Sequence, residues 1–300
     1  MTDQPPPLPQ ARPGLAAVWM LGSVFAFTAM AVAVREVSAR HDSFEIMTYR
    51  SAVGFAMVLA FAGLTGRLGS VTTERLGGHF LRNIVHFAGQ NLWFWALTMI
   101  PLAQVFAIEF TAPIWVILLA PLFLGEPLTR LRLLSAALGF AGVLMVARPE
   151  LNNLDPGVLA AAGSALCFAT VAILTKRLTR GQSVTTILFW LTLMQFCFGL
   201  IGAGIDGAIT LPDAKTLPWL VLIGFCGVLA HLSLTSALSL APASAVVPVD
   251  FLRLPLVALV AAWLYAEPLD PKVFLGAGVI FLGIWINLRA DLRRDSAPTP

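Results

Sequence analysis

One stretch of this chain occurs twice. Residues 96–142 and residues 237–283 align without a gap at a constant offset of 141 positions, and the offset places Glu109 on Asp250. Other matched pairs are Pro101 with Pro242, Glu126 with Glu267, Pro127 with Pro268 and Gly142 with Gly283. Acids and prolines are rare in an apolar chain, so general hydrophobicity does not explain these matches. The pattern indicates a duplication, in which one half of the protein is built like the other.

The composition places both halves in a membrane. Of 300 residues, 58% are hydrophobic and 12% are charged, whereas about 25% charged residues is typical of soluble chains. A soluble fold has too little interior for this much apolar surface, so the expected solvent is lipid. The net charge of +3 comes largely from residues between apolar segments, which indicates membrane topology and no nucleic-acid partner. The three cysteines have no metal or redox spacing, and we expect no metal and no cofactor.

The apolar segments predict an all-α polytopic membrane protein with ten transmembrane helices. Each segment has about the 20 residues that a helix needs to cross a bilayer. The expected spans are 15–34, 45–64, 77–98, 102–124, 131–147, 157–175, 184–205, 217–238, 243–265 and 272–289.

Lysines and arginines in the connections predict the orientation. With both termini in the cytoplasm, eleven of them lie inside and five outside. Five spans per copy is an odd number, so the second copy is expected upside down, as an inverted repeat. The predicted units are a cytoplasmic tail 1–13, a first repeat 14–149, a second repeat 150–289 and a cytoplasmic tail 290–300.

A polar stripe follows the third span. Residues spaced by three or four positions share one helix face there: His79, Asn83, His86, Gln90 and Trp93. Such a stripe cannot face lipid, so it faces protein or a wet cavity. The offset places His231 of the eighth span opposite Gln90, which suggests that both copies line one space. For His86 and His231, two interpretations stay open: a neutral imidazole bonded to a neighbouring helix, or a cavity residue that contacts substrate or carries a proton.

Buried acids are the second group of candidates, because a central charge costs about 3 kcal/mol on insertion scales. Glu109 and Asp250 each lie about seven residues into their spans. Arg253, three residues after Asp250, is expected to pair with it. Glu109 has no such local partner, and we expect it to be protonated, paired across helices or hydrated.

The remaining polar residues in or near spans receive structural interpretations. Tyr49 and Arg50, and likewise His79 and Arg82, lie near span ends and are expected to be interfacial or snorkelling. Glu126 is expected in a surface turn. Prolines inside the fourth and ninth spans permit kinks: Pro113, Pro121, Pro248 and Pro255. Small residues in the fifth and tenth spans predict close helix packing or a dimer face: Ser135, Gly139, Gly142, Gly276 and Gly283.

These features together resemble EamA-type carriers of the drug/metabolite transporter superfamily. The resemblance rests on Ala96-Leu97, Pro101-Leu102-Ala103, Pro113 and Leu124-Gly125-Glu126-Pro127-Leu128, and on their second copies, although Tyr265-Ala266 replaces the Leu-Gly expected there. It implies a ten-helix inverted-repeat fold with a central cavity lined by spans 1–4 and 6–9. It does not determine the substrate.

The expected function is a secondary transporter of the bacterial inner membrane that exports small amphipathic metabolites, first of all apolar or aromatic amino acids, by alternating access. The expected substrate-binding residues are His86, Gln90, Trp93, Glu109, His231 and Asp250. An exporter of drugs, nucleosides or cations with proton antiport is the alternative, and the oligomeric state stays open between monomer and homodimer. An intramembrane enzyme lacks a suitable nucleophile, base or metal motif, so we expect no catalytic residues. A channel lacks re-entrant filter loops.

Overall fold

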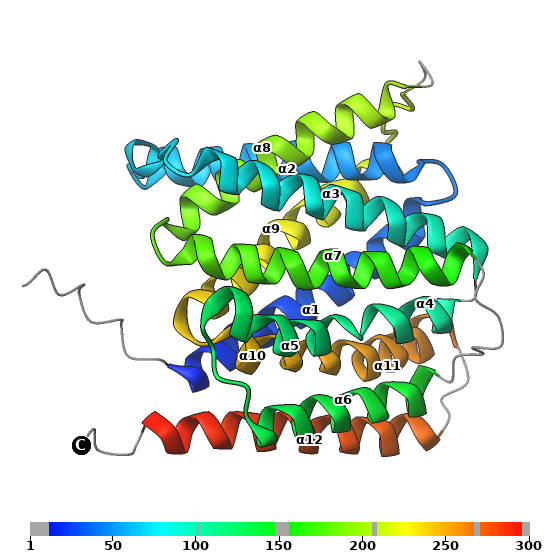
Figure 1. Cartoon of the computed structure of the whole chain (residues 1–300). Coiled ribbons are helices and arrows are strands. Elements are labelled where there is room, and N and C mark those ends of the chain that lie inside the picture. The colour runs from blue at the N-terminus through cyan, green and yellow to red at the C-terminus, as the bar shows by residue number, and fades with distance from the viewer. Residues whose placement is uncertain (1–11, 101, 148–155, 206–208, 267–270, 296–300) are drawn as a thin grey trace, which may run out of the picture.

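The computed structural model describes residues 12–100, 102–147, 156–205, 209–266 and 271–295, and in these ranges the chain is helical with no strand (Figure 1). The first half contains α1 (Pro13–Val37), α2 (Ser43–Leu64), the short 3-10 helix η1 (Leu68–Ser70), α3 (Leu76–Met99), α4 (Leu102–Glu109), α5 (Ala112–Leu124) and α6 (Arg130–Ala147). The second half contains α7 (Pro156–Thr179), α8 (Val184–Ala203), α9 (Leu217–Leu240), α10 (Ala243–Val246), the 3-10 helix η2 (Val247–Leu252), α11 (Arg253–Tyr265) and α12 (Pro271–Asp295).

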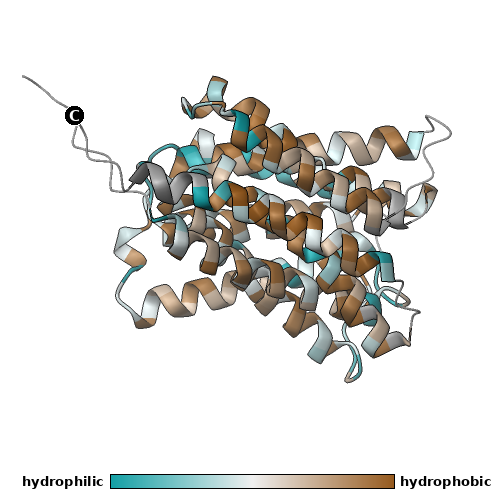
Figure 2. Ribbon diagram, turned by 90° about the horizontal axis from the view of Figure 1, so that it is seen from below, coloured by the Kyte–Doolittle hydropathy of each residue, from teal (hydrophilic) through white to brown (hydrophobic). Residues whose placement is uncertain are grey.

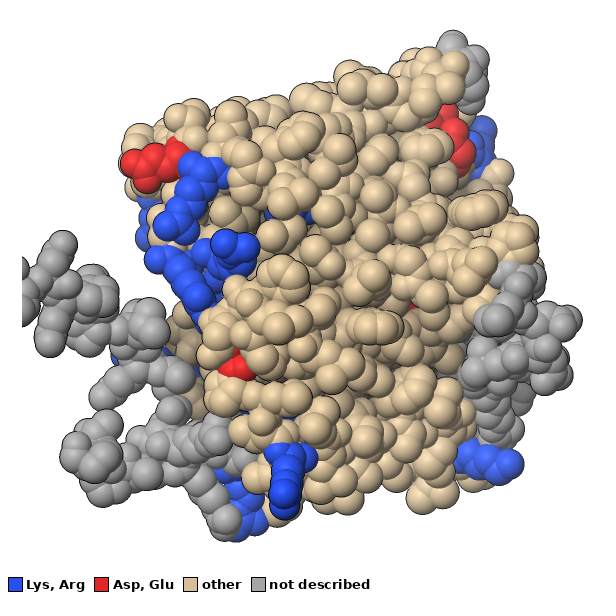
Figure 3. Space-filling view, viewed as in Figure 1, with Lys and Arg blue, Asp and Glu red and all other residues tan. Residues whose placement is uncertain are grey.

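The surface of the described chain is that of a multi-pass membrane protein. Eight described segments are long and apolar enough to cross a bilayer. The third and fifth expected spans, α3 and α6, are not among the eight; α3 carries the polar stripe, and α6 ends at the edge of a described range. Apolar residues dominate the long helices in Figure 2, and Figure 3 shows Lys, Arg, Asp and Glu gathered at the two ends of a broad uncharged band. This band has the character of a lipid-facing belt.

Two of the expected spans are broken in the middle. Residues 102–124 form α4 and α5 with a turn at Phe110 and Thr111, and residues 243–265 form α10, η2 and α11. Pro113 stands in the first turn of α5 and Pro248 in η2, where a missing N–H interrupts the α-helical hydrogen bonding. The predicted kinks at these two prolines are confirmed. Pro121, by contrast, lies inside the continuous helix α5.

The helices pack in pairs that join the two halves. The closest neighbours are α1 with α9, α3 with α7, α2 with α8, and α6 with α12. In Figure 1 the α6–α12 pair lies apart at the lower edge, with α6 and α12 running in opposite directions.

Small residues explain the α6–α12 contact. A Cβ atom on Gly142 would lie 2.6 Å from the carbonyl oxygen of Gly276, and one on Gly283 would lie 2.8 Å from that of Ser135. The two backbones can approach this closely only because the side chains are small. The prediction of close packing by the fifth and tenth spans is therefore confirmed.

Charged side chains cap two helix ends, one of them across the halves. Glu126 accepts hydrogen bonds from the backbone N–H groups of Ala243 at 2.8 Å and Ser244 at 3.1 Å, at the start of α10. Lys176 donates to the carbonyl oxygens of Leu238 and Ala241 at 2.6 and 2.7 Å, at the end of α9. Opposite charges at the two kinds of helix end match the helix dipole. Glu126 is thus structural, as expected, but it is buried and caps a helix of the other half. Its repeat mate Glu267 lies outside the described residues.

Candidate functional site

A cavity of about 700 Å³ lies between the halves. Its volume is within the roughly 300–1,000 Å³ of small-molecule sites. All six residues expected at the site line it: His86, Gln90, Trp93, Glu109, His231 and Asp250. The other described lining residues come from α1, α2, α3, α4, α5, α7, α9, η2 and α11. Among the described residues α6 and α12 contribute none, as the resemblance implied, but α8 also contributes none, which corrects the expectation that the seventh span lines the cavity.

One end of the polar lining is an acid–arginine cluster, formed by Trp93, Glu109, Asp250 and Arg253. One terminal nitrogen of Arg253 lies 2.8 Å from Glu109 Oε1 and 2.9 Å from Asp250 Oδ2. Trp93 Nε1 donates to Glu109 Oε2 at 2.7 Å. The pairing of Asp250 with Arg253 is confirmed, and of the three states expected for Glu109 the structure shows the cross-helix pair. Two carboxylates share one guanidinium, so the cluster carries a net charge of −1 when all three groups are ionised.

The helix breaks position these carboxylates. Glu109 is the last residue of α4, and Asp250 lies in η2. Arg253 begins α11 and also stacks against Phe27 and Phe110, with its guanidinium carbon 5.4 and 5.1 Å from the ring centres. Glu109 therefore lies at the break between α4 and α5, and Asp250 lies in the 3-10 stretch between α10 and α11.

A guanidinium–amide cluster consists of Arg50 and Gln90, which line the cavity, and Gln195 of α8, which does not. With the Gln90 amide oxygen turned toward Arg50, both terminal nitrogens of Arg50 donate to it at 3.1 Å, and the Gln90 nitrogen donates to Gln195 Oε1 at 3.3 Å. Arg50 is only 9% exposed. The interfacial interpretation of Arg50 is wrong: α2 begins at Ser43, so Arg50 lies seven residues, about 10 Å, into the helix.

Two histidines lie close to each other in the cavity wall. The ring centres of His86 and His231 are 5.1 Å apart, and Phe27 meets His231 edge-on at 5.6 Å. Neither ring nitrogen of His231 has a hydrogen-bond partner among the described residues. Nδ1 of His86 lies 3.4 Å from a terminal nitrogen of Arg82, on its own helix. Of the two interpretations left open by the sequence, this geometry favours cavity residues over imidazoles bonded to a neighbouring helix.

The start of the polar stripe is buried in protein. Arg82 is 1% exposed and donates to Thr175 at 3.2 Å and to Asn83 at 2.9 Å. His79 is fully buried as well, and its ring nitrogens have no partner among the described residues. The snorkelling interpretation of these two residues is wrong, because α3 presents this face to α7 and α8. Neither residue lines the cavity.

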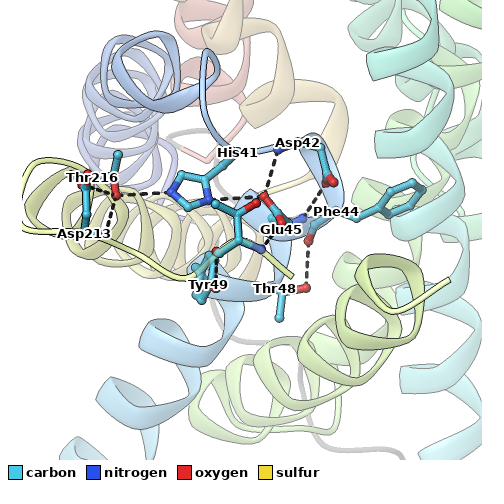
Figure 4. Close-up of polar contacts among 9 residues, drawn as sticks. His41, Asp42, Phe44, Glu45, Thr48, Tyr49, Asp213 and Thr216 are labelled. Carbon is cyan, nitrogen blue, oxygen red and sulfur yellow. Dashed lines mark hydrogen bonds and ion pairs between the residues drawn. The ribbon is translucent and has the colours of Figure 1, made fainter. Parts of the chain in front are cut away.

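A separate polar network joins α2 to the segment before α9 (Figure 4). His41 lies 3.3 Å from Glu45 Oε2 through Nδ1 and 3.2 Å from the Thr216 hydroxyl through Nε2. The Tyr49 hydroxyl donates to the carbonyl oxygen of Thr210 at 2.7 Å, which agrees with a position near the helix end. Hydrogen bonds from the Thr216 backbone lower the pKa of Asp213 to about 2. Within the described residues the polar groups of this network bond to one another.

Metal chemistry has no support in the described part of the chain, which contains no group of three His, Cys, Asp or Glu side chains suited to a metal ion.

Comparison with known proteins agrees with this architecture. The EamA-like transporter family matches residues 14–148 and again residues 155–289. The chain is 30% identical over 275 residues to a riboflavin transporter of Vibrio cholerae, covering 89% of this chain and 91% of the relative. It is 27% identical over 262 residues to an S-adenosylmethionine uptake transporter of Rickettsia felis, covering 87% of this chain and 88% of the relative. A solved crystal structure shares the fold with a TM-score of 0.79 at 16% identity, covering 94% of this chain and 99% of that one.

The family matches nearly the whole chain, and the matches fall on the two copies that the internal offset indicated. The resemblance inferred from the sequence is thereby confirmed: this chain belongs to the EamA-like transporter family.

Proposed function

We propose that this protein is a secondary transporter that carries a small amphipathic metabolite across the bacterial inner membrane by alternating access. One observation carries the proposal: both halves build the same cavity, and Gln90 and His231, which are equivalent at the 141 offset, both line it. The cavity wall also holds Arg253 of the second half bonded to Glu109 of the first. A relative movement of the halves would therefore reshape the cavity.

The proposal includes ten crossings arranged as two inverted repeats with both termini in the cytoplasm. The contacts between helices support this arrangement, because they have the same symmetry as the repeat. When each residue is replaced by its mate 141 positions away, the α1–α9 contact becomes the α7–α3 contact. In the same way, the contact of Gly142 with Gly276 becomes the contact of Gly283 with Ser135. The opposite directions of the repeat mates α6 and α12 in Figure 1 are what an in-plane two-fold axis requires. The excess of Lys and Arg in the connections on the side of the termini supports the orientation.

The substrate is proposed by chemical class. The lining combines aromatic rings with a few charged and amide groups, which suits a molecule with an apolar or heterocyclic part and a polar part. The sequence favoured export of apolar or aromatic amino acids. The relatives are named for riboflavin and for S-adenosylmethionine, and one of the names specifies uptake. The three candidates are therefore tested together, in an assay that does not depend on direction.

Proton antiport is a second candidate, and one feature favours it. The acid–arginine cluster has one more acid than base, and Oδ1 of Asp250 has no hydrogen-bond partner among the described residues. A proton on either acid would neutralise the cluster. An imposed pH gradient that drives substrate uphill would support this coupling, and counterflow that is insensitive to the gradient would count against it.

Counterflow in proteoliposomes tests the transporter itself. Vesicles loaded with unlabelled tryptophan, riboflavin or S-adenosylmethionine are diluted into the same labelled compound. We expect saturable, transient accumulation for at least one of them, and weaker accumulation after His86→Ala or Gln90→Ala. Flux that rises linearly with concentration would indicate a pore, and no flux with any of the three would contradict the proposed substrate class.

A further inference from the structure

One arginine of the cavity wall, Arg50, has no ion-pair partner among the described residues. The described lining of the cavity includes three arginines: Arg35 in the last turn of α1, Arg50 inside α2 and Arg253 at the start of α11. Arg253 lies against two carboxylates, whereas no Asp or Glu among the described residues lies within ion-pair distance of Arg50. The Arg50 guanidinium has five N–H donors. Among the described residues, their one acceptor is the neutral amide oxygen of Gln90.

No described acid contacts Arg50, and the nearest charged neighbour on α3, Arg82, adds a second positive charge. Arg82, one turn before His86 on α3, bonds only to the neutral groups of Thr175, Asn83 and His86. A buried guanidinium without a carboxylate is costly, because an ion in low dielectric needs a partner of opposite charge. A long side chain near a helix end normally avoids this cost by reaching water at the interface. Arg50 instead lies about 10 Å into α2 and faces the cavity.

The position of Arg50 is prepared by neighbouring glycines. A Cβ atom on Gly227 of α9 would lie 3.2 Å from Cδ and 3.3 Å from Cγ of Arg50. A Cβ atom on Gly224 would lie 3.2 Å from the Arg50 carbonyl oxygen. The absence of a side chain at Gly227 leaves room for the arginine stem, and Gly224 lets α9 approach the backbone of α2 closely. The guanidinium is therefore held at the cavity by packing, and its charge is left available.

We propose that Arg50 is the anchor for an anionic group of the transported molecule, a carboxylate or a phosphate, which binds the guanidinium in the cavity beside Gln90 and His231. Planar, two-point recognition by arginine suits either anion. The inference rests on the proposed transport function and narrows it: among the candidates named above, amino acids and S-adenosylmethionine carry a carboxylate, whereas riboflavin carries no anionic group. The acid–arginine cluster lies in the same cavity, so an ammonium or other cationic part of the substrate has acidic partners there.

This inference is tested with matched pairs of ligands, in which one member carries the anionic group and the other lacks it. The probes are tryptophan against tryptophanamide, S-adenosylmethionine against its decarboxylated form, and riboflavin 5′-phosphate against riboflavin. Binding to purified protein in detergent is measured by Tm shift and by titration of tryptophan fluorescence. In at least one ligand pair we expect wild-type protein to bind the anionic compound roughly tenfold to hundredfold more tightly than the neutral one. This difference is what a charge-assisted hydrogen bond provides. A preference in the first two pairs assigns a carboxylate, and a preference in the third assigns a phosphate.

Variants separate an anion site from a structural role. Arg50→Gln should remove the preference in that pair, Arg50→Lys should retain part of it, and Arg67→Gln, at an exposed position after α2, should leave it unchanged. The Arg50→Lys protein keeps the test valid if Arg50→Gln fails to fold.

Wild-type protein that binds no anionic member better than its neutral partner, or a preference that persists in Arg50→Gln, overturns the inference. Counterflow of a neutral compound by wild-type protein and by Arg50→Gln alike would leave the transporter proposal intact while refuting the anion site. Wild-type protein that shows neither counterflow nor binding of any probe would refute both.

Discussion

Two of the three arginines that line the cavity, Arg50 and Arg253, show how differently one membrane protein treats the same side chain. Arg253 is held by Glu109 and Asp250 and stacks on Phe27 and Phe110. Arg50 is buried beside amides and glycines. A fully paired charge is part of the scaffold, and an unpaired charge in a cavity is available to a ligand. The comparison therefore assigns a structural role to Arg253 and a binding role to Arg50.

The largest effect is expected from removing Arg253. Arg253→Met leaves two buried carboxylates without their cation, and breaking a buried pair in this way costs roughly 3 kcal/mol or more. The Tm of the purified protein should fall by about 6 °C or more, given about 2 °C or more per kcal/mol for a chain of this size. Arg253→Lys should recover part of the loss. A wild-type Tm in Arg253→Met would refute the structural role.

Removing one acid should relieve this defect. Glu109→Gln alone leaves Asp250 paired one-to-one with Arg253 and should be mild. In Arg253→Met/Glu109→Gln one of the two orphaned carboxylates is gone, so the double variant should be less destabilised than the sum of the single variants by about 1–2 kcal/mol. A double-mutant cycle on Tm measures this coupling, and strict additivity would show that the two residues do not interact.

The same change at Arg50 should destabilise the protein much less than Arg253→Met does, or should stabilise it. Arg50→Met removes a buried charge that has no carboxylate partner, so the free energy of unfolding should stay within about 1 kcal/mol of wild type or rise. The comparison with Arg253→Met uses identical chemistry at two sites in one cavity. Equal losses in both variants would abolish the distinction between them.

The sequence predicts the fold and the surroundings of Arg253 better than it predicts the surroundings of Arg50. Lipid forbids unpaired polar groups, so the stripe on 77–98 and the offset pairing of Gln90 with His231 indicated the cavity directly. Arg253 was recognisable because its partner Asp250 is three residues away. The contact of Arg253 with Glu109 joins residues 144 apart in sequence and depends on how the halves dock.

Arg50 was misplaced for a different reason. A span predicted to start at residue 45 puts Arg50 near its end, where long basic side chains usually snorkel. The helix starts at Ser43, where Asp42 and Glu45 form a capping box. That pairing of Asp with Glu three residues later is visible in the sequence, and it would have placed Arg50 deeper.

A smaller effect is expected at the glycine that receives the Arg50 stem. Gly227→Ala places a Cβ atom 3.2 Å from Arg50 Cδ, so the flexible side chain must shift by a few tenths of an ångström. Affinity for the anionic member of the preferred ligand pair should fall roughly fivefold, which corresponds to about 1 kcal/mol. Gly163→Ala, which would meet only Leu92 at 3.2 Å, is the matched control. Unchanged affinity in Gly227→Ala would mean that Arg50 is not positioned by α9.

The smallest effect concerns the self-contained network of Figure 4. The lowered pKa of Asp213 means that its stabilising contribution is complete above its ordinary value of 3.8 and is lost as pH falls toward about 2. The Tm difference between wild type and Asp213→Asn should therefore be the same at pH 7 and pH 5. A difference that changes between these two pH values would contradict the assignment of the stabilisation to the Asp213 carboxylate.

We propose that the cavity between the halves opens to each side of the membrane in turn. Cysteine accessibility tests this mechanism without knowledge of the substrate. The described residues include three native cysteines, Cys167, Cys197 and Cys226, which are replaced first. A single cysteine at Gln90 is then exposed to a membrane-impermeant maleimide in right-side-out and in inside-out vesicles, with a cysteine at the outward-facing Phe281 of α12 as control. Labelling of the Gln90 position from both sides, with none at Phe281, is the predicted result; labelling of the Gln90 position from one side only, or from neither, would contradict it.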